Sequence, residues 1–137
     1  MHKIILGASA ATLVLLSLAA AGPAAAAKCQ TKYLTGTWVG QPQVGGDYCI
    51  VEFNQRGWIV QASCFDPASL KSGATFDGRF TATPSCSVAG NYDVIPKRGP
   101  TQTTRFTGTL DPKTGVMRGR VEQGAAPRVR YLFRQQW

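Results

Sequence analysis

The sequence is poor in the groups that most enzymes use for chemistry. Its only histidine is His2, which lies in an N-terminal segment that we expect to be removed. The remaining chain therefore lacks a histidine-assisted serine or cysteine nucleophile, and it lacks the histidine-based ligand sets of zinc sites. It has only seven carboxylates, and no pattern brings two of them together as a glycosidase requires. We predict a protein that is not an enzyme, with no catalytic residue, no metal site and no cofactor.

The sequence also lacks an apolar run long enough to predict a transmembrane helix. The longest run, residues 4–18, follows Lys3 and leads to the small residues Ala25 to Ala27. A cationic start, a short apolar stretch and a small-residue end are typical of a secretory signal peptide. We expect residues 1–27 to be cleaved, the chain to reach the periplasm or the cell exterior, and no transmembrane segment to remain.

The remaining residues, 28–137, have a length that suits a single domain, and they contain no linker, low-complexity segment or repeat. The full chain has a formal charge of +8, which falls to +7 when Lys3 is lost. Basic side chains exceed acidic ones mainly in the C-terminal third, where residues 99–137 carry seven of the former and two of the latter. This excess raises the question of an anionic partner.

Four cysteines are present: Cys29, Cys49, Cys64 and Cys86. An even set in a short exported chain indicates disulfides, and four cysteines allow three pairings. The stretch from Cys49 to Cys64 alternates apolar and polar residues on both sides of Arg56-Gly57, as a β-hairpin would. Folding about this turn pairs inner-face residues whose numbers sum to 113: Cys49 with Cys64, Val51 with Ala62, and Phe53 with Val60.

Directly opposed strand residues lie at a separation that a disulfide can span. We therefore predict a disulfide between Cys49 and Cys64 inside the hairpin, which leaves Cys29 to pair with Cys86.

Helical periodicity is absent, and short alternating segments separated by glycine and proline take its place. A second strong hairpin signal lies at residues 111–115, where Pro112 presets the turn and Gly115 can adopt the left-handed conformation. Other predicted strands cover residues 34–39, 76–82, 88–95 and 128–134. About eight strands indicate an all-β domain, an antiparallel up-and-down β-barrel of lipocalin or avidin-like architecture, with a β-sandwich as the alternative.

Two features of this barrel follow from the alternation. In the stretch LTGTWVG, Gly36 and Trp38 begin the first strand, which predicts a tryptophan that plugs one end. The inward residues are large enough to fill an eight-stranded barrel as core, which argues against a small-molecule carrier. They are Phe53, Val60, Phe80, Met117, Tyr131 and Phe133.

Arginines gather near the last hairpin. A turn at residues 123–126 would place Arg118 opposite Arg130 and Arg120 opposite Arg128 on one outer face. Like charges facing each other across strands are unfavourable. Two interpretations are open: the arginines form a solvated outer wall of the barrel, or they bind an anionic partner such as a lipid headgroup, an acidic glycan or nucleic acid. The candidate anion-binding residues are Arg105, Arg118, Arg120, Arg128, Arg130 and Arg134.

A longer set of residues resembles a known family. Leu34, Gly36, Trp38 and Val39, followed by Cys49, Trp58 and Cys64, resemble the periplasmic inhibitors of serralysin-type zinc metalloproteases over residues 34–64. The resemblance implies an eight-stranded barrel with a disulfide in the hairpin region. It also implies inhibition by a segment before the barrel, which enters the protease cleft and approaches the zinc.

In this chain the inhibitory segment would be residues 28–33. Its candidate protease contacts are Lys28, Gln30, Thr31, Lys32 and Tyr33. The sequence thus predicts an exported binding protein, with inhibition of a secreted metalloprotease, binding of an anionic partner, and transport of a small molecule as its three alternatives.

Overall fold

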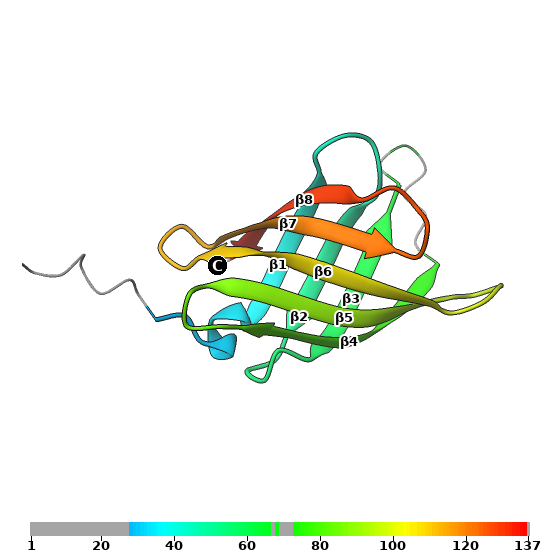
Figure 1. Ribbon diagram of the computed structural model, residues 1–137. Coiled ribbons are helices and arrows are strands. Elements are labelled where there is room, and N and C mark those ends of the chain that lie inside the picture. Colours follow the sequence, from blue (N-terminus) through cyan, green and yellow to red (C-terminus); the bar gives the residue numbers. More distant parts are fainter. Residues whose placement is uncertain (1–27, 67, 69–72, 137) are drawn as a thin grey trace, which may run out of the picture.

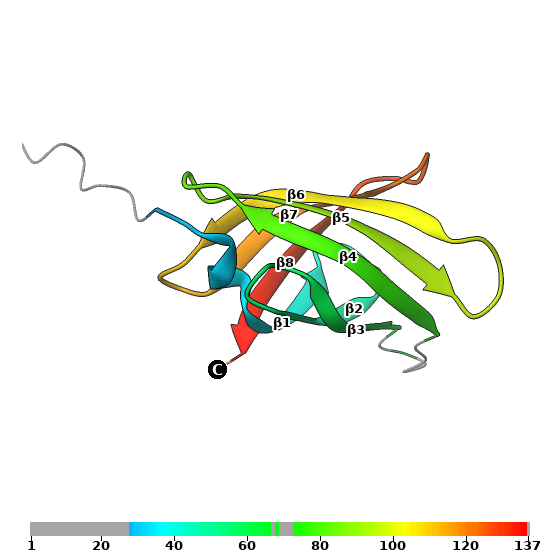
Figure 2. The same ribbon diagram turned by 90° about the horizontal axis from the view of Figure 1, so that it is seen from below.

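The computed structural model describes residues 28–66, 68 and 73–136. The predicted signal peptide, residues 1–27, lies outside the described residues. A short 3-10 helix, η1 (Thr31–Leu34), precedes eight antiparallel strands that follow one another in chain order (Figures 1 and 2). These strands are β1 (Gly36–Pro42), β2 (Tyr48–Phe53), β3 (Ile59–Phe65), β4 (Ala74–Ala82), β5 (Ser87–Pro96), β6 (Gln102–Asp111), β7 (Val116–Gln123) and β8 (Val129–Gln136).

The strands form one sheet that curls until β1 pairs with β8. The predicted up-and-down barrel is therefore confirmed, and the alternative of a sandwich is not needed. The predicted strands agree in number and approximate place. The first begins at Gly36 rather than Leu34, and the last begins at Val129 rather than Arg128. Leu34 belongs to η1 instead, and Gly36 has a φ of 111°, which glycine adopts without a steric penalty.

The barrel is nearly closed, and its seam lies between the edge strands β3 and β4. An isolated bridge joins Trp58 to Arg79 there, and the Phe80 N–H donates to the Gly57 carbonyl at 2.8 Å. The Arg79 guanidinium lies 5.6 Å from the centre of the Trp58 ring and donates through Nε to the Arg56 carbonyl at 2.8 Å. These contacts hold the two edges together at one end of the seam.

One end of the barrel is closed by the N-terminal segment. Trp38 and Leu34 are fully buried there, and the Trp38 Nε1–H donates to the Leu34 carbonyl at 2.8 Å. Val88, Leu110 and Met117 are buried with them. The loops that follow β1, β5 and β7 lie at the opposite end (Figure 1), which we call the open end.

Both predicted disulfides are confirmed, Cys29 with Cys86 and Cys49 with Cys64. Disulfides form and persist in oxidising compartments, so this pair indicates an extracellular or periplasmic environment. Among the described residues, no helix has the length and apolar character needed to cross a bilayer.

The hairpin of β2 and β3 keeps the predicted register from Tyr48 to Glu52. Cys49 faces Cys64 and Val51 faces Ala62, as predicted. Phe53, however, faces Ile59 instead of Val60, because a β-bulge shifts the pairing next to it.

The bulge overturns two inward assignments. Val60 is 61% exposed and points out of the barrel, while Ile59 packs against the core in its place. Trp58 lies two residues before Val60, so the same alternation would place it on the inner face, but it is 46% exposed. The cause is a turn longer than two residues, in which the Asn54 side chain accepts hydrogen bonds from the N–H groups of Arg56 and Trp58, at 2.9 and 3.0 Å.

Candidate functional site

A belt of aromatic side chains crosses the barrel interior. Ring centres lie 5.6 Å apart for Tyr92 and Phe80, 5.4 Å for Phe80 and Phe106, 5.8 Å for Phe106 and Phe133, and 5.5 Å for Phe133 and Tyr131. The three phenylalanines are almost completely buried. We call these five residues the aromatic belt. It separates the packed half of the barrel at the closed end from the other half.

A cavity of about 340 Å³ occupies the half of the barrel at the open end. The aromatic belt forms its floor, and its walls are mostly apolar: Val51, Ile59, Ala62, Phe76, Val94, Val121 and Val129. Sites for small molecules have this size and character, and the mouths of β-barrels are a frequent place for them. Of the residues predicted to form the core, Phe53, Phe80, Met117 and Phe133 are indeed buried, but they do not fill the barrel as far as its open end. Phe80, Phe133 and Tyr131 bound the cavity instead of filling it.

A few polar groups line the same cavity. The Gln123 Nε2–H donates to Thr104 Oγ1 at 3.2 Å, and the Tyr131 hydroxyl donates to the Asp47 carbonyl at 2.9 Å. Within the described part of the chain, the Tyr92 hydroxyl has no such partner. No buried side-chain nitrogen or oxygen is left unpaired there, so this hydroxyl has exposed surface, and Tyr92 is among the residues that line the cavity.

The two tyrosines remain neutral. Burial raises the pKa of Tyr92 well above its ordinary value, and the nearby Tyr131 adds to the shift. Burial also raises the pKa of Tyr131, with a smaller contribution from the negative charge of Asp47. Both side chains are protonated at neutral pH, which makes Tyr92 a neutral hydrogen-bond donor. Asp47, at the rim, is the one charged residue among those that line the cavity.

Sequence reasoning missed Tyr92, Thr104 and Gln123 as candidate site residues. The signal that could have found them was their odd or even position in the inward and outward alternation of each strand. Each lies on the inner face of its strand, toward the open end, where a filled core would have apolar residues. Inward polar residues from three strands at one end of a barrel indicate a lined space.

The N-terminal segment, residues 28–33, is docked on the closed end. Cys29 is tied to Cys86 by the disulfide and donates its N–H to the Pro84 carbonyl at 3.1 Å. Thr31 Oγ1 accepts a hydrogen bond from the Ala82 N–H at 3.1 Å. Inhibition of a protease stays a prediction, and these tethers leave little free length for insertion into a cleft. The side chains exposed for a partner are Lys28, Gln30, Lys32 and Tyr33.

The last hairpin has a register two residues away from the predicted one. Arg120 faces Arg130, and Arg118 faces Leu132. The predicted pairs of Arg118 with Arg130 and Arg120 with Arg128 are therefore wrong. The reason is a longer loop, because β8 begins only at Val129 and leaves Arg128 outside the strand.

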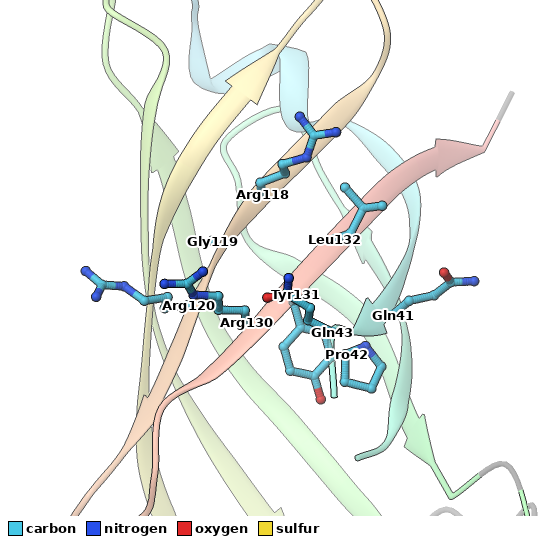
Figure 3. Close-up of a pocket in the computed structure, with 9 residues that line it drawn as sticks. All are labelled: Gln41, Pro42, Gln43, Arg118, Gly119, Arg120, Arg130, Tyr131 and Leu132. Atoms are coloured by element: carbon cyan, nitrogen blue, oxygen red, sulfur yellow. The ribbon is translucent and has the colours of Figure 1, made fainter. Parts of the chain in front are cut away.

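Three of the six candidate arginines border one outer pocket of about 660 Å³, seen in Figure 3. We call it the arginine pocket. It is lined by Arg118, Arg120 and Arg130, with Gln41, Pro42, Gln43, Gly119, Tyr131 and Leu132. The other three arginines lie outside it. Arg105 faces Glu122 across β6 and β7, Arg134 faces Val116, and Arg128 forms an ion pair with Glu122 at 3.1 Å.

In the part of the chain that the structure describes, no group of three or more histidine, cysteine, aspartate or glutamate side chains could hold a metal ion. Among the hollows of the described residues, the cavity and the arginine pocket are the two that we consider as ligand sites. No family model, curated protein or solved structure matches this chain.

Proposed function

We propose that this protein is an exported, non-enzymatic binding protein that holds a small uncharged molecule in the open end of its barrel. The observation that carries the proposal is the cavity of about 340 Å³, with the Tyr92 hydroxyl accessible at its edge. The two disulfides support export to an oxidising compartment.

The lining selects the ligand by its chemistry. Apolar surface buried against the valines and the aromatic belt stabilises the complex by about 25 cal/mol per Å². Aromatic rings also pair favourably with other rings, so the belt favours a ligand that contains one. Tyr92 can donate a hydrogen bond to one oxygen of the ligand. Below Asp47, which lies at the rim and is the one charged residue of the lining, a charged ligand would lose its hydration without meeting an opposite charge.

The first test uses the neutral dye N-phenyl-1-naphthylamine, whose fluorescence rises in apolar surroundings. We expect one dye molecule to bind each wild-type barrel. Ala62→Phe fills the cavity and should weaken binding by at least about tenfold. Val60→Phe is the matched control, because it lies on the same strand but points outward.

Equal dye binding by the two variants would contradict the proposal, as would the absence of binding to the wild type. Circular dichroism of each variant shows whether the barrel has kept its fold, so that loss of binding is not confused with unfolding.

A second test addresses Tyr92. We expect Tyr92→Phe to weaken binding of the ketone 2-acetylnaphthalene by about fivefold to tenfold, the equivalent of a hydrogen bond worth ~1 kcal/mol. The hydrocarbon 2-ethylnaphthalene has the same ring system without an acceptor, and its affinity should not change. Both affinities follow from displacement of the dye. An equal effect on the two compounds would exclude the hydrogen bond.

A further inference from the structure

We infer that the arginine pocket binds an acidic polysaccharide, independently of the cavity inside the barrel. The pocket lies on the outer wall of β1, β7 and β8 (Figure 3). Its walls combine guanidinium groups, side-chain amides and a small apolar surface, and each of these matches one part of a charged sugar chain.

The charge arrangement is the first support. Arg120 and Arg130 face each other directly across β7 and β8, and Arg118 lies on the same outer face, two residues from Arg120. Like charges in this position are unfavourable. Within the described ranges, none of the three forms an ion pair, since the neighbouring Glu122 is engaged by Arg128. A bound anion would relieve the repulsion, and guanidinium groups bind carboxylates and sulfates in a bidentate manner.

The uncharged lining points to sugar. Gln41 and Gln43 contribute amides, which can both donate to and accept from hydroxyl groups. Pro42 and Leu132 offer apolar surface, against which the C–H face of a sugar ring can pack. A partner with carboxylates alone would leave the amides without a role, whereas a chain of acidic sugars would use all three kinds of group.

Two other anionic partners fit this surface less well. Binding of single-stranded nucleic acid relies on rings on which bases stack. The one aromatic residue of the pocket, Tyr131, has its ring against Phe133 inside the barrel and its hydroxyl bonded to Asp47. A bilayer presents a broad flat surface, whereas these arginines border a concave one. The net charge, +8 for the full chain and +7 without Lys3, favours approach of any polyanion, and the pocket supplies the selectivity.

The test is calorimetric titration of the mature, oxidised protein with oligogalacturonate of defined length. We expect binding that weakens with salt and that is lost when the carboxylates of the same oligosaccharide are methyl-esterified. Polyglutamate, which has carboxylates but no hydroxyl groups, should bind at least about tenfold more weakly. Equal binding of the esterified chain or of polyglutamate would overturn the proposal. So would tighter binding of single-stranded DNA or of anionic phospholipid vesicles.

Two charge-reversal variants locate the site. Arg120→Glu with Arg130→Glu should weaken oligogalacturonate binding by at least about tenfold. Lys97→Glu with Arg98→Glu is the control, since it changes the net charge equally at exposed positions between β5 and β6, outside the pocket. Equal losses in the two variants would mean unspecific attraction and would overturn the proposal.

The double variant Gln41→Ala with Gln43→Ala tests the contribution of the amides without changing the charge of the protein. We expect it to lower the affinity for oligogalacturonate severalfold and to leave polyglutamate unaffected. An unchanged affinity for oligogalacturonate would show that the amides do not take part in recognition, and it would overturn the proposal that the ligand is a sugar chain. Dye binding in the cavity should be the same in all these variants, so the two sites can fail separately.

Discussion

The hydroxyl of Tyr131 donates a hydrogen bond of 2.9 Å to the backbone carbonyl of Asp47, 84 residues away in the sequence. The bond ties β8 to the loop that follows β1, at the rim of the cavity. Tyr131 also stacks on Phe133 of the aromatic belt. One side chain thus connects the floor of the cavity to its mouth.

Removing this hydroxyl should loosen the rim. We expect Tyr131→Phe to lower the free energy of unfolding by about 1 kcal/mol, because one hydrogen bond is lost while the ring remains. For a domain of this size the melting temperature should fall by about 4 °C. Thermal unfolding followed by circular dichroism measures the change. Tyr33→Phe, at an exposed position with no side-chain hydrogen bond among the described residues, is the control. Equal melting temperatures in all three proteins would show that the bond contributes nothing.

Alkaline pH should destabilise the barrel through Tyr92. Its pKa in the folded chain is raised by burial, so above the ordinary value of about 10 the unfolded state loses this proton first. The stabilisation is complete below about pH 10 and is lost as the pH rises toward the folded pKa, with a slope that approaches about 1.4 kcal/mol per pH unit. Urea unfolding between pH 9 and 11 should show a steeper decline for the wild type than for Tyr92→Phe. Parallel curves would contradict the assignment.

The two disulfides should differ in what they contribute. The Cys29–Cys86 bridge spans 57 residues and the Cys49–Cys64 bridge spans 15. On the chain-entropy account, the longer loop stabilises by about 4 kcal/mol and the shorter by about 3 kcal/mol. Replacing each pair by alanines and comparing urea midpoints tests this order. The Cys49→Ala, Cys64→Ala variant should also bind dye less tightly, since that bridge lines the cavity. A greater loss from the shorter bridge would favour local packing over loop entropy.

Protease inhibition can be tested directly on the docked N-terminal segment. We expect no stoichiometric inhibition of a serralysin-type zinc protease by the oxidised protein, because Cys29 and Thr31 fix the segment to the barrel. Deleting residues 28–32 should lower the stability by removing the Cys29–Cys86 bridge. Inhibition by the intact protein that disappears on this deletion would instead support the resemblance to the inhibitor family.

The fold could be predicted because the alternation of apolar and polar residues along each strand shows which side chains share a face. The same rule explains why the arginines were correctly predicted to share the outer face, while the residues opposite Arg118 and Arg120 were not predicted correctly. The loop at residues 124–128 has no turn signature that fixes its length, and the register moved by two residues, which preserves the face. The bulge at Phe53 moved the pairing by one residue, and there the inner and outer sides of Val60 were exchanged.

The volume of the cavity could not be predicted in the same way. Parity shows that Phe80, Phe106 and Phe133 point inward, but it does not show how much space remains beyond them. That space depends on how these rings pack against one another around one level of the barrel. This packing joins strands that are far apart in the sequence. The outer pocket likewise depends on Gln41 and Gln43 lying next to β8, a pairing of the first strand with the last.

The pairing of β1 with β8 means that the order of strands around the sheet is a cycle cut between β3 and β4. A circular permutant that joins residue 136 to the segment before η1 and opens the chain between Phe65 and Ala74 would place its new ends at that cut. Every hydrogen-bonded pair of strands would then also be adjacent in sequence. The natural order instead leaves β1 and β8 to meet across nearly the whole chain. Because folding slows as contacts become less local, the permutant should reach the same barrel faster.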